Sequence, residues 1–374
     1  MADLAAPGRP RFERATGPSR LASVLVPVVS IGLALAFGGL VLLAAGEDPI
    51  AVYRAMLRGA LGDRNGVAET LVKTIPLLLT GLGVALAFRM RLWNIGAEGQ
   101  LYLGAVAATG LGLYLLPGAP APVLIPAMVA AGLLGGAAWG AIPGALLAFL
   151  GANEIITSLM LNYVAVLFAE YLVHGPWRDP ASFGFPGTPP LPEAAWLPRW
   201  ETTRVHLGLL FGLIAAAALW LALRRTRWGY EVGVTGANPR AARYAGMPTR
   251  RAVLTVMALS GALAGLAGMS EVAGVGHQLQ RNLSPGYGYT AIIVAWLGHL
   301  HPAGVTLVAF LLAAILVGGD QLQATVGLPA AIAPMLQGTI LFFLLGGEAL
   351  TRYRLTWRRP AIDAPSAAAG VERA

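Results

Sequence analysis

The sequence predicts an all-α integral membrane protein, a polytopic helical bundle of about ten transmembrane segments with both termini in the cytoplasm. Of its 374 residues, 56% are hydrophobic and only 12% are charged, whereas ordinary soluble domains carry about 25% charged residues. The apolar residues form long runs. The first, 21–45, is too long for a secretory signal and long enough to cross the hydrocarbon core of about 30 Å.

Ten apolar runs account for the predicted spans. They are 21–45, 72–88, 101–116, 123–150, 155–173, 206–223, 252–273, 287–300, 302–318 and 328–345. The run 287–300 rises only about 21 Å, so we expect a half-helix, a tilted helix or a span extended by polar backbone facing a cavity. With all ten crossings, 18 of the 26 basic residues lie inside and 8 outside, as the positive-inside rule requires.

Three regions follow from this topology. The polar N-terminal tail 1–20 and the C-terminal tail 351–374 are expected in the cytoplasm, and the Ala- and Pro-rich end of the second is expected to be partly disordered. The transmembrane domain is 21–350, with a polar cytoplasmic loop at 224–251. Because the arginines flank apolar runs and do not share one soluble face, they indicate contact with the lipid bilayer and no nucleic-acid partner.

Composition and motifs exclude several kinds of chemistry. The chain has no cysteine, which excludes disulfides, thiolate metal sites and cysteine nucleophiles. A P-loop needs a Gly-Lys-Ser/Thr step, but the single lysine, Lys73, follows Val72, and Val67 stands where the first glycine is required. The five histidines are scattered, and neither a His-Glu-x-x-His nor a Gly-x-Ser-x-Gly motif occurs. We therefore predict no catalytic residue, no metal site and no cofactor bound by this chain.

The loop 224–251 encodes a short helix with both ends defined. Asn238 can cap its first turn, Pro239 suits the first helical position, and Gly246 can adopt the left-handed stop before Pro248. A helix of about 10 Å is marginal alone in water, which favours docking onto a partner. The alternative is a basic loop on anionic headgroups, worth about 1 kcal/mol per arginine, but headgroup binding does not need defined helix ends. Docking is expected to use a small-residue face of Ala241, Ala242 and Ala245, and the residues assigned to this function are Gly236, Asn238, Pro239, Ala241, Ala242, Arg243, Tyr244 and Gly246.

Glycine recurs at every fourth position of the long run 123–150. The residues are Gly132, Gly136, Gly140 and Gly144. Such a stripe lets a neighbouring helix approach closely where lipid gives no hydrophobic drive, so we expect a helix-packing seam. A second set, Gly261, Gly265 and Gly268, occupies close-packing positions in the run 252–273.

Polar residues inside or beside apolar runs are the candidates for a substrate pathway or gate, because such residues normally face a cavity or a partner. They are Asn94, Glu98, Gln100, Asn153, Glu154, Asn162, Tyr163 and Gln278. Each has a structural alternative. Asn94 can cap the third span, Glu98 can complement the positive end of that same helix, and Asn153 and Glu154 can serve as caps or contact a partner. Asn162 can bond a neighbouring helix. An outer vestibule is expected from Glu271, Gln278, Gln280, Arg281 and Asn282.

Four sequence segments carry a family resemblance. The segment GANPRAARYAGM in the loop 224–251 resembles the coupling-helix signature of ABC importer permeases of the branched-chain amino acid, simple sugar and nucleoside type. The segments LWNIGAEGQLYLGA, GANEIITSLMLNYVA and GYGYTAIIVAWLG look most like the nucleoside permeases of that group. The resemblance covers about 21–350.

This resemblance implies a transmembrane permease subunit of a binding-protein-dependent importer of the bacterial cytoplasmic membrane. It implies two ABC ATPase subunits, which hold ATP and Mg²⁺ and dock on 224–251. It also implies a second, paralogous permease and an extracytoplasmic solute-binding lipoprotein. Nucleosides would move inward by ATP-driven alternating access. The alternatives are a simple-sugar permease and an ion-coupled secondary transporter. The second is disfavoured because such transporters place ionisable residues near mid-membrane, and an intramembrane enzyme lacks any assembled motif.

Overall fold

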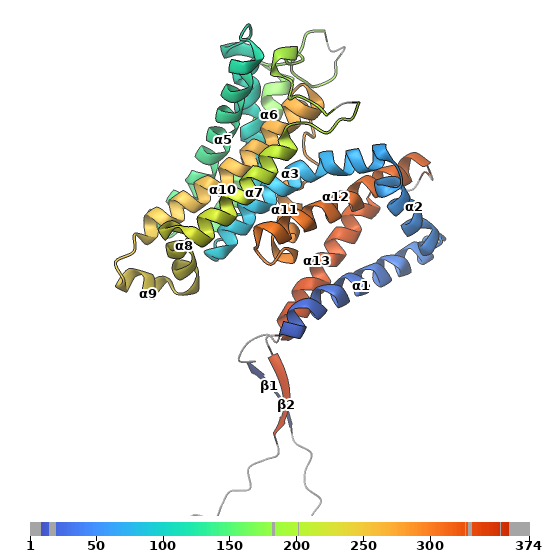
Figure 1. Cartoon of the computed structure of the whole chain (residues 1–374), viewed down its shortest axis with the longest axis vertical. Helices are drawn as coiled ribbons and strands as arrows, with labels where there is room; N and C mark the ends of the chain where they lie inside the picture. The colour runs from blue at the N-terminus through green and yellow to red at the C-terminus, as the bar shows by residue number, and fades with distance from the viewer. Residues whose placement is uncertain are drawn as a thin grey trace, which may run out of the picture. The chain divides into compact units, whose positions relative to one another are not determined.

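The structure is a computed structural model, and it describes residues 9–14, 20–181, 184–200, 202–325, 327, 331–351 and 353–358. Helices form nearly all of its regular structure (Figure 1). The chain divides into two compact units. The larger unit is Leu42–Gln337, and the smaller unit combines Met1–Val41 with Gly338–Ala374.

The larger unit contains eleven complete α-helices among the described residues. They are α2 Pro49–Leu61, α3 Arg64–Arg89, α4 Ala97–Gly110, α5 Ala121–Ala145, α6 Glu154–His174, α7 Gly208–Arg225, α8 Arg227–Ala237, α9 Pro239–Tyr244, α10 Thr249–Glu271, α11 Tyr287–Leu297 and α12 Pro302–Thr325. Single π-helical turns extend three of them, at Leu111–Leu115 after α4, Leu146–Leu150 after α5 and Val272–Gly276 after α10. A short 3₁₀ helix lies at Glu193–Ala195.

Two helices run from one unit into the other, namely α1 Arg20–Ala44 and α13 Ile332–Thr351. Within the smaller unit the Ser30 hydroxyl donates a hydrogen bond to the Phe343 carbonyl (3.0 Å), which joins these helices. The tails contain strands β1 Arg9–Arg14 and β2 Tyr353–Arg358, which pair antiparallel with Arg9 opposite Arg358. The sequence did not predict this pairing, and the Ala- and Pro-rich end expected to be disordered lies outside the described residues.

Each expected span corresponds to a helix, although α4, at the expected span 101–116, is not among those long and apolar enough to cross a membrane. By length and composition, six described helices can cross a membrane, namely α3, α5, α6, α7, α10 and α12 with their π-helical extensions. A seventh is counted if α1 and its bent continuation α2 form one span, and α11 and α13 are shorter apolar helices. The helical membrane bundle is therefore observed, while ten crossings remain a prediction.

The helix α3 forms the centre of the larger unit. It packs against α2, α7, α10, α11 and α12 (Figure 1), and 89% of its most apolar stretch is buried. A helix that is apolar all round has no face suited to water and is buried by neighbours. It begins at Arg64, where the Asp63 carboxylate accepts the Gly66 N–H (2.6 Å), and this cap explains why the helix starts eight residues before the expected position 72.

The glycine stripe of α5 lies directly against α10. A Cβ built on Gly136 would stand 2.7 Å from the Gly265 Cα, and one on Gly140 would stand 2.6 Å from the Met257 carbonyl oxygen. At Gly132 and Gly144 the nearest atoms of α10 are Cβ atoms at 2.7 and 2.8 Å. Since ordinary carbon contacts are about 3.5–4.0 Å, only glycine fits at this separation. The stripe is the buried face of a helix that is otherwise largely exposed.

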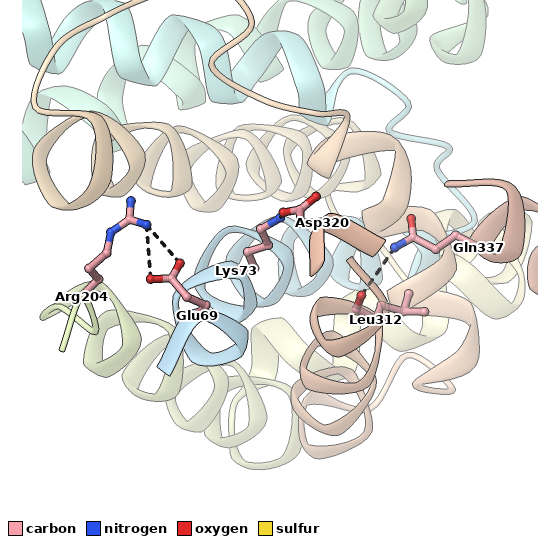
Figure 2. Close-up of polar contacts among 6 residues, drawn as sticks. All are labelled: Glu69, Lys73, Arg204, Leu312, Asp320 and Gln337. Atoms are coloured by element: carbon pink, nitrogen blue, oxygen red, sulfur yellow. Dashed lines mark hydrogen bonds and ion pairs between the residues drawn. The ribbon is translucent and has the colours of Figure 1, made fainter. Parts of the chain in front are cut away.

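Two ion pairs connect the first turns of α3 with other elements (Figure 2). Arg204, in the loop before α7, donates to both carboxylate oxygens of Glu69 at 3.1 and 3.2 Å. Lys73, the single lysine of the chain, pairs with Asp320 of α12. These side chains are partly exposed, so each pair stabilises the fold by only about 0–1 kcal/mol. They link α3 to the loop before α7 and to α12.

Candidate functional site: a short exposed helix and a buried polar network

The short helix α9 has the ends that the sequence specifies. The Asn238 side chain accepts the N–H groups of Arg240 (3.0 Å) and Ala241 (3.1 Å), and Pro239 is the first helical residue. Gly246 has a φ of 73°, the left-handed conformation that favours glycine. Figure 1 shows α8 and α9 at the end of the larger unit away from the loop 175–207. The predicted helix and both of its ends are confirmed.

The small-residue face expected on α9 is wrong at one position. Ala242 is fully buried within this chain. Gly236, at the end of α8, is also buried. A short helix that must hold its own orientation turns one face inward, and Ala242 lies on the face that packs toward α10. The outward face instead presents Ala241, Arg243 and Tyr244. Tyr244 is 94% exposed.

The preceding helix α8 was not predicted. It begins after Thr226, whose hydroxyl accepts the Gly229 N–H (3.1 Å), and it ends where Asn238 begins α9. Its end approaches the end of α3, because a Cβ on Gly236 would lie 3.0 Å from the Met90 Cα. The signal that could have revealed it is the capping position of Thr226 three residues before Gly229. The loop 224–251 is thus a packed helical element.

A closed pair of amides fixes the start of α4. The Asn94 amide donates to the Gln100 side-chain oxygen (2.8 Å), and Gln100 donates back to the Asn94 oxygen (2.9 Å). Asn94 also donates to the hydroxyl of Ser260 on α10 (2.8 Å). Asn94 does not cap α4, as the sequence suggested, because its amide is engaged with Gln100 and Gly96 occupies the capping position. Both amides are buried and bonded, so they hold helices together.

Glu98 lies in the first turn of α4, where its charge complements the N-terminus of that helix as the sequence suggested, and it also contacts the N-terminus of a second helix. Its carboxylate accepts the N–H of Gly288 (2.7 Å), in the first turn of α11. Ser284 reinforces this turn, because its hydroxyl accepts the Tyr287 N–H (3.0 Å). A carboxylate at this end is favourable because the first N–H groups of a helix are unpaired and carry partial positive charge. Tertiary contact brings α11 to Glu98, so local sequence could not identify the partner.

Asn162 links three elements at the middle of α6. Its side-chain oxygen accepts the Gly99 N–H (2.8 Å), and its amide donates to the Ile95 carbonyl (2.7 Å) and to the Tyr289 hydroxyl (3.4 Å). The side chain is 1% exposed, so its structural use is interhelical bonding. The next residue, Tyr163, lies about 100° further round α6 and is 58% exposed. Sequence reasoning did not single out Tyr289.

The remaining candidates lie at the two ends of the bundle. Asn153 caps α6 by accepting the Ile155 N–H (2.9 Å), and Glu154 accepts the Trp93 N–H (3.3 Å). Gln278 donates to Gln280 (3.3 Å) in the loop after α10, and neither belongs to the buried network. Glu271 was expected to line an outer vestibule with these residues, but it is only 7% exposed at the end of α10. Its burial is due to the helix continuing through Val272–Gly276.

Two histidines pack beside the same loop. His206 is fully buried and its Nδ1 accepts the Gly208 N–H (3.2 Å), while burial, followed by the charge of Arg199, lowers its pKa from 6.5 to about 4. The His277 ring stacks on Trp196 at 4.0 Å, and burial and Arg199 also lower its pKa. Across the described ranges, no group of three His, Cys, Asp or Glu residues is placed to hold a metal ion.

Comparison with known proteins identifies the family. The family described as branched-chain amino acid transport system, permease component, matches residues 66–345. The chain belongs to this permease family. The glucose ABC transporter permease protein TsgB13 of Haloferax volcanii is 39% identical, over 92% of this chain and 93% of that protein. The guanosine permease NupP of Bacillus subtilis is 34% identical over 88% and 95%, and the nucleoside permease NupB of Lactococcus lactis is 32% identical over 86% and 90%.

These relatives confirm the resemblance carried by the loop 224–251 and the three other segments. The chain is a permease subunit of an ABC importer and a multi-pass membrane protein. Its relatives are the transport subunits of such systems, so the chain is not an enzyme by itself. Its permease relatives include both sugar and nucleoside importers, and family membership therefore leaves the solute to be decided by experiment.

Proposed function

We propose that this permease moves a nucleoside into the cytoplasm by ATP-driven alternating access, as one of two paralogous permease subunits. The observation that carries the proposal is α9, a six-residue helix capped at both ends whose Tyr244 is 94% exposed. An isolated helix of this length is unstable in water, so a defined and exposed one is suited to fit a partner. The partners would be two ABC ATPase subunits that bind ATP and Mg²⁺, since the chain has no P-loop.

The connections of α9 supply a route for force. It continues from α8, which follows α7, and its buried Ala242 faces α10. In turn α10 packs along α3, α4 and α5. Because close-packed helices move together rather than deform, closure of two docked ATPases would displace α7 and α10 as bodies and reorient the bundle around the solute pathway.

The proposed topology has ten crossings with both termini and α9 in the cytoplasm. The ten apolar helices α1, α3, α4, α5, α6, α7, α10, α11, α12 and α13 would be the spans. With 11 residues, α11 rises about 16 Å and would cross only part of the bilayer. This orientation places most arginines inside. It also leaves the loop 175–207 outside the cytoplasmic membrane. An extracytoplasmic solute-binding lipoprotein would dock on this outer side of the permease.

A simple sugar is the second candidate solute, because the glucose permease of Haloferax volcanii shares 39% identity with this chain. Both solutes are compact rings with several hydroxyl groups. The test is uptake by the complete complex, with both permeases, the ATPases and the binding protein, reconstituted in vesicles with guanosine or glucose. Guanosine uptake that needs ATP inside the vesicles, with little glucose uptake, is the expected result. Glucose uptake alone would replace the nucleoside by the sugar.

Coupling through α9 is tested in the same vesicles. Gly246→Val forces a branched side chain into a left-handed conformation, and Tyr244→Asp places a charge on the exposed face. Both should preserve membrane insertion and solute capture but abolish uptake and solute-stimulated ATP hydrolysis. The control Arg243→Gln removes an exposed charge and retains the helix ends. Loss of uptake in the control alone, with normal transport in the other two, would show that the loop acts through charge and not as a docking helix.

A further inference from the structure

We propose that Tyr163 and Tyr289 form a contact site for the ring and hydroxyl groups of the transported solute, on a surface shared by α6 and α11. The inference rests on the proposed function and deepens it by locating the solute. It begins with the one-sided packing of α6. Its Ser158, Asn162 and Ala165 are buried, whereas Met160, Tyr163, Leu167 and Tyr171 are exposed. Tyr163 directly follows Asn162, whose amide donates to the Tyr289 hydroxyl.

The depth of Tyr163 is unusual for a lipid-facing tyrosine. It is the tenth of 21 residues in α6, about 13 Å from the start of the helix. Membrane proteins place tyrosine at the two interfaces, where the hydroxyl meets water. At mid-span a hydroxyl facing lipid would lack any hydrogen-bond partner, which costs free energy. Tyr163 is 58% exposed on the surface of this chain, so something more polar than lipid is expected to cover it.

Tyr289 brings a second hydroxyl to the same depth. It is 42% exposed, and the Asn162 amide donates to its hydroxyl (3.4 Å). The bonds from Gly99 to Asn162 (2.8 Å) and from Gly288 to Glu98 (2.7 Å) place the first turn of α11 level with the middle of α6. The backbone before α11 is therefore irregular at membrane depth, which occurs only where it is buried in protein or lines a water-filled cavity.

A charged pair continues this surface. Glu170 lies two turns beyond Tyr163 on α6 and pairs with Arg281 (3.5 Å), whose side chain is 58% exposed. Glu170 lies in the last turns of α6 and Arg281 in the loop before α11, so the pair lies where this surface meets water. The amides and the carboxylate of the buried network are occupied by protein partners, so they cannot bind solute without breaking the fold. The exposed tyrosines can bind solute without breaking these bonds.

Two tyrosines at one depth fit a particular class of solute. An aromatic ring stacks on a nucleobase or on the C–H face of a sugar, and a phenolic hydroxyl can donate to and accept from solute hydroxyls. Ionic or aliphatic solutes would gain little from this pair. The surface suits a compact hydroxylated ring, as in a ribonucleoside or a hexose.

Accessibility of single cysteines tests the site, since the chain has none of its own. Tyr163→Cys and Tyr289→Cys are introduced into the complete complex in vesicles and treated with a charged methanethiosulfonate. The reagent should modify both cysteines, and saturating guanosine with its binding protein should slow modification about tenfold or more, because a site about 90% occupied leaves about a tenth of the thiols open to the reagent. Leu134→Cys on α5, exposed by 68%, is the lipid-facing control and should not react.

Three outcomes would overturn the site. Reaction of Tyr163→Cys no faster than Leu134→Cys would mean that the surface faces lipid. The cysteine of Tyr163→Cys could instead form a spontaneous disulfide with the same cysteine of a second copy, or with a cysteine of the paired permease. If solute did not affect that disulfide, the surface would be a subunit interface. If the wild-type complex takes up guanosine while modification stays unprotected by it, the contact site alone fails. If the wild type takes up neither guanosine nor glucose, the proposed function fails.

Two further variants separate a solute contact from a structural role. Tyr163→Phe retains the ring and Tyr163→Ala removes it. Stacking on an aromatic ring is worth about 1–3 kcal/mol per base, so the alanine variant should lower the uptake rate at subsaturating guanosine about tenfold, and the phenylalanine variant by much less. Equal uptake by both variants and the wild type, with the complex intact, would remove the tyrosine from the pathway.

Discussion

The seam between α5 and α10 gives a quantitative prediction for Gly136→Ala. The added Cβ would lie 2.7 Å from the Gly265 Cα, about 1 Å closer than a normal carbon contact. The nearby atoms of α10 are backbone, so no side chain can rotate away, and the helices must separate along the whole seam. Overpacking of this kind costs about 1–3 kcal/mol.

The opposing effect is the helix preference of alanine over glycine, about 1 kcal/mol. We therefore expect Gly136→Ala to destabilise the fold by up to about 2 kcal/mol overall. The matched control is Gly32→Ala on α1, where a Cβ meets nothing within 4 Å. With no overpacking, this variant should be neutral or slightly stabilised. The two alanine substitutions thus differ in sign for a reason found only in the packing.

The assay is the midpoint of thermal unfolding of the purified protein in detergent, followed by size-exclusion chromatography after heating. Gly136→Ala should unfold several degrees below the wild type, and Gly32→Ala at or above it. Gly136→Leu should prevent recovery of the assembled protein. A midpoint for Gly136→Ala equal to or above that of Gly32→Ala would refute close packing as the reason for the stripe.

Three other predictions follow from the loops and the short helix. Ala181 and Arg240 are both exposed and lie on opposite sides of the membrane in the proposed topology. A cysteine at Ala181 should therefore be labelled from outside the cell, and one at Arg240 only after permeabilisation. The reverse pattern would show that the proposed orientation is wrong. The pKa of His206 is about 4 in the folded protein, against 6.5 when unfolded. The folded state therefore has its full stability above pH 6.5 and should lose about 3 kcal/mol of unfolding free energy as the pH falls to 4. In His206→Gln the midpoint of thermal unfolding should depend less on pH, and a pH dependence equal to that of the wild type would contradict this. Asn238→Ala removes the cap of α9, so solute-stimulated ATP hydrolysis should fall while insertion is normal, and wild-type hydrolysis would show that the cap is dispensable.

Much of the architecture could be predicted from local sequence. Membrane helices must satisfy their backbone hydrogen bonds within themselves, so the positions of the apolar runs determine where α3, α5, α6, α7, α10 and α12 lie. The ends of α9 are also local, because the Asn238 cap and the Gly246 turn involve residues within a few positions of each other. The same holds for the cap of α6 by Asn153.

The site could not be predicted in the same way, because its partners are distant in the sequence. Glu98 meets Gly288 of α11, and Asn162 meets Gly99 and Tyr289. In each case a side chain bonds a helix end that only tertiary packing brings near. The sequence showed that these polar groups needed partners, since an unpaired polar group in a membrane is costly, but it could not say which.

Which face of a helix is buried, and against which neighbour, is the other property that only the tertiary structure decided. A helix of small residues has several possible buried faces, and Ala242 was assigned outward although it is buried against this chain. The glycine stripe of α5 was recognisable from its spacing alone, but its partner is α10, more than a hundred residues along the chain. Spacing within a helix determines which residues share a face, whereas the neighbour that covers that face is set by how all the helices pack together.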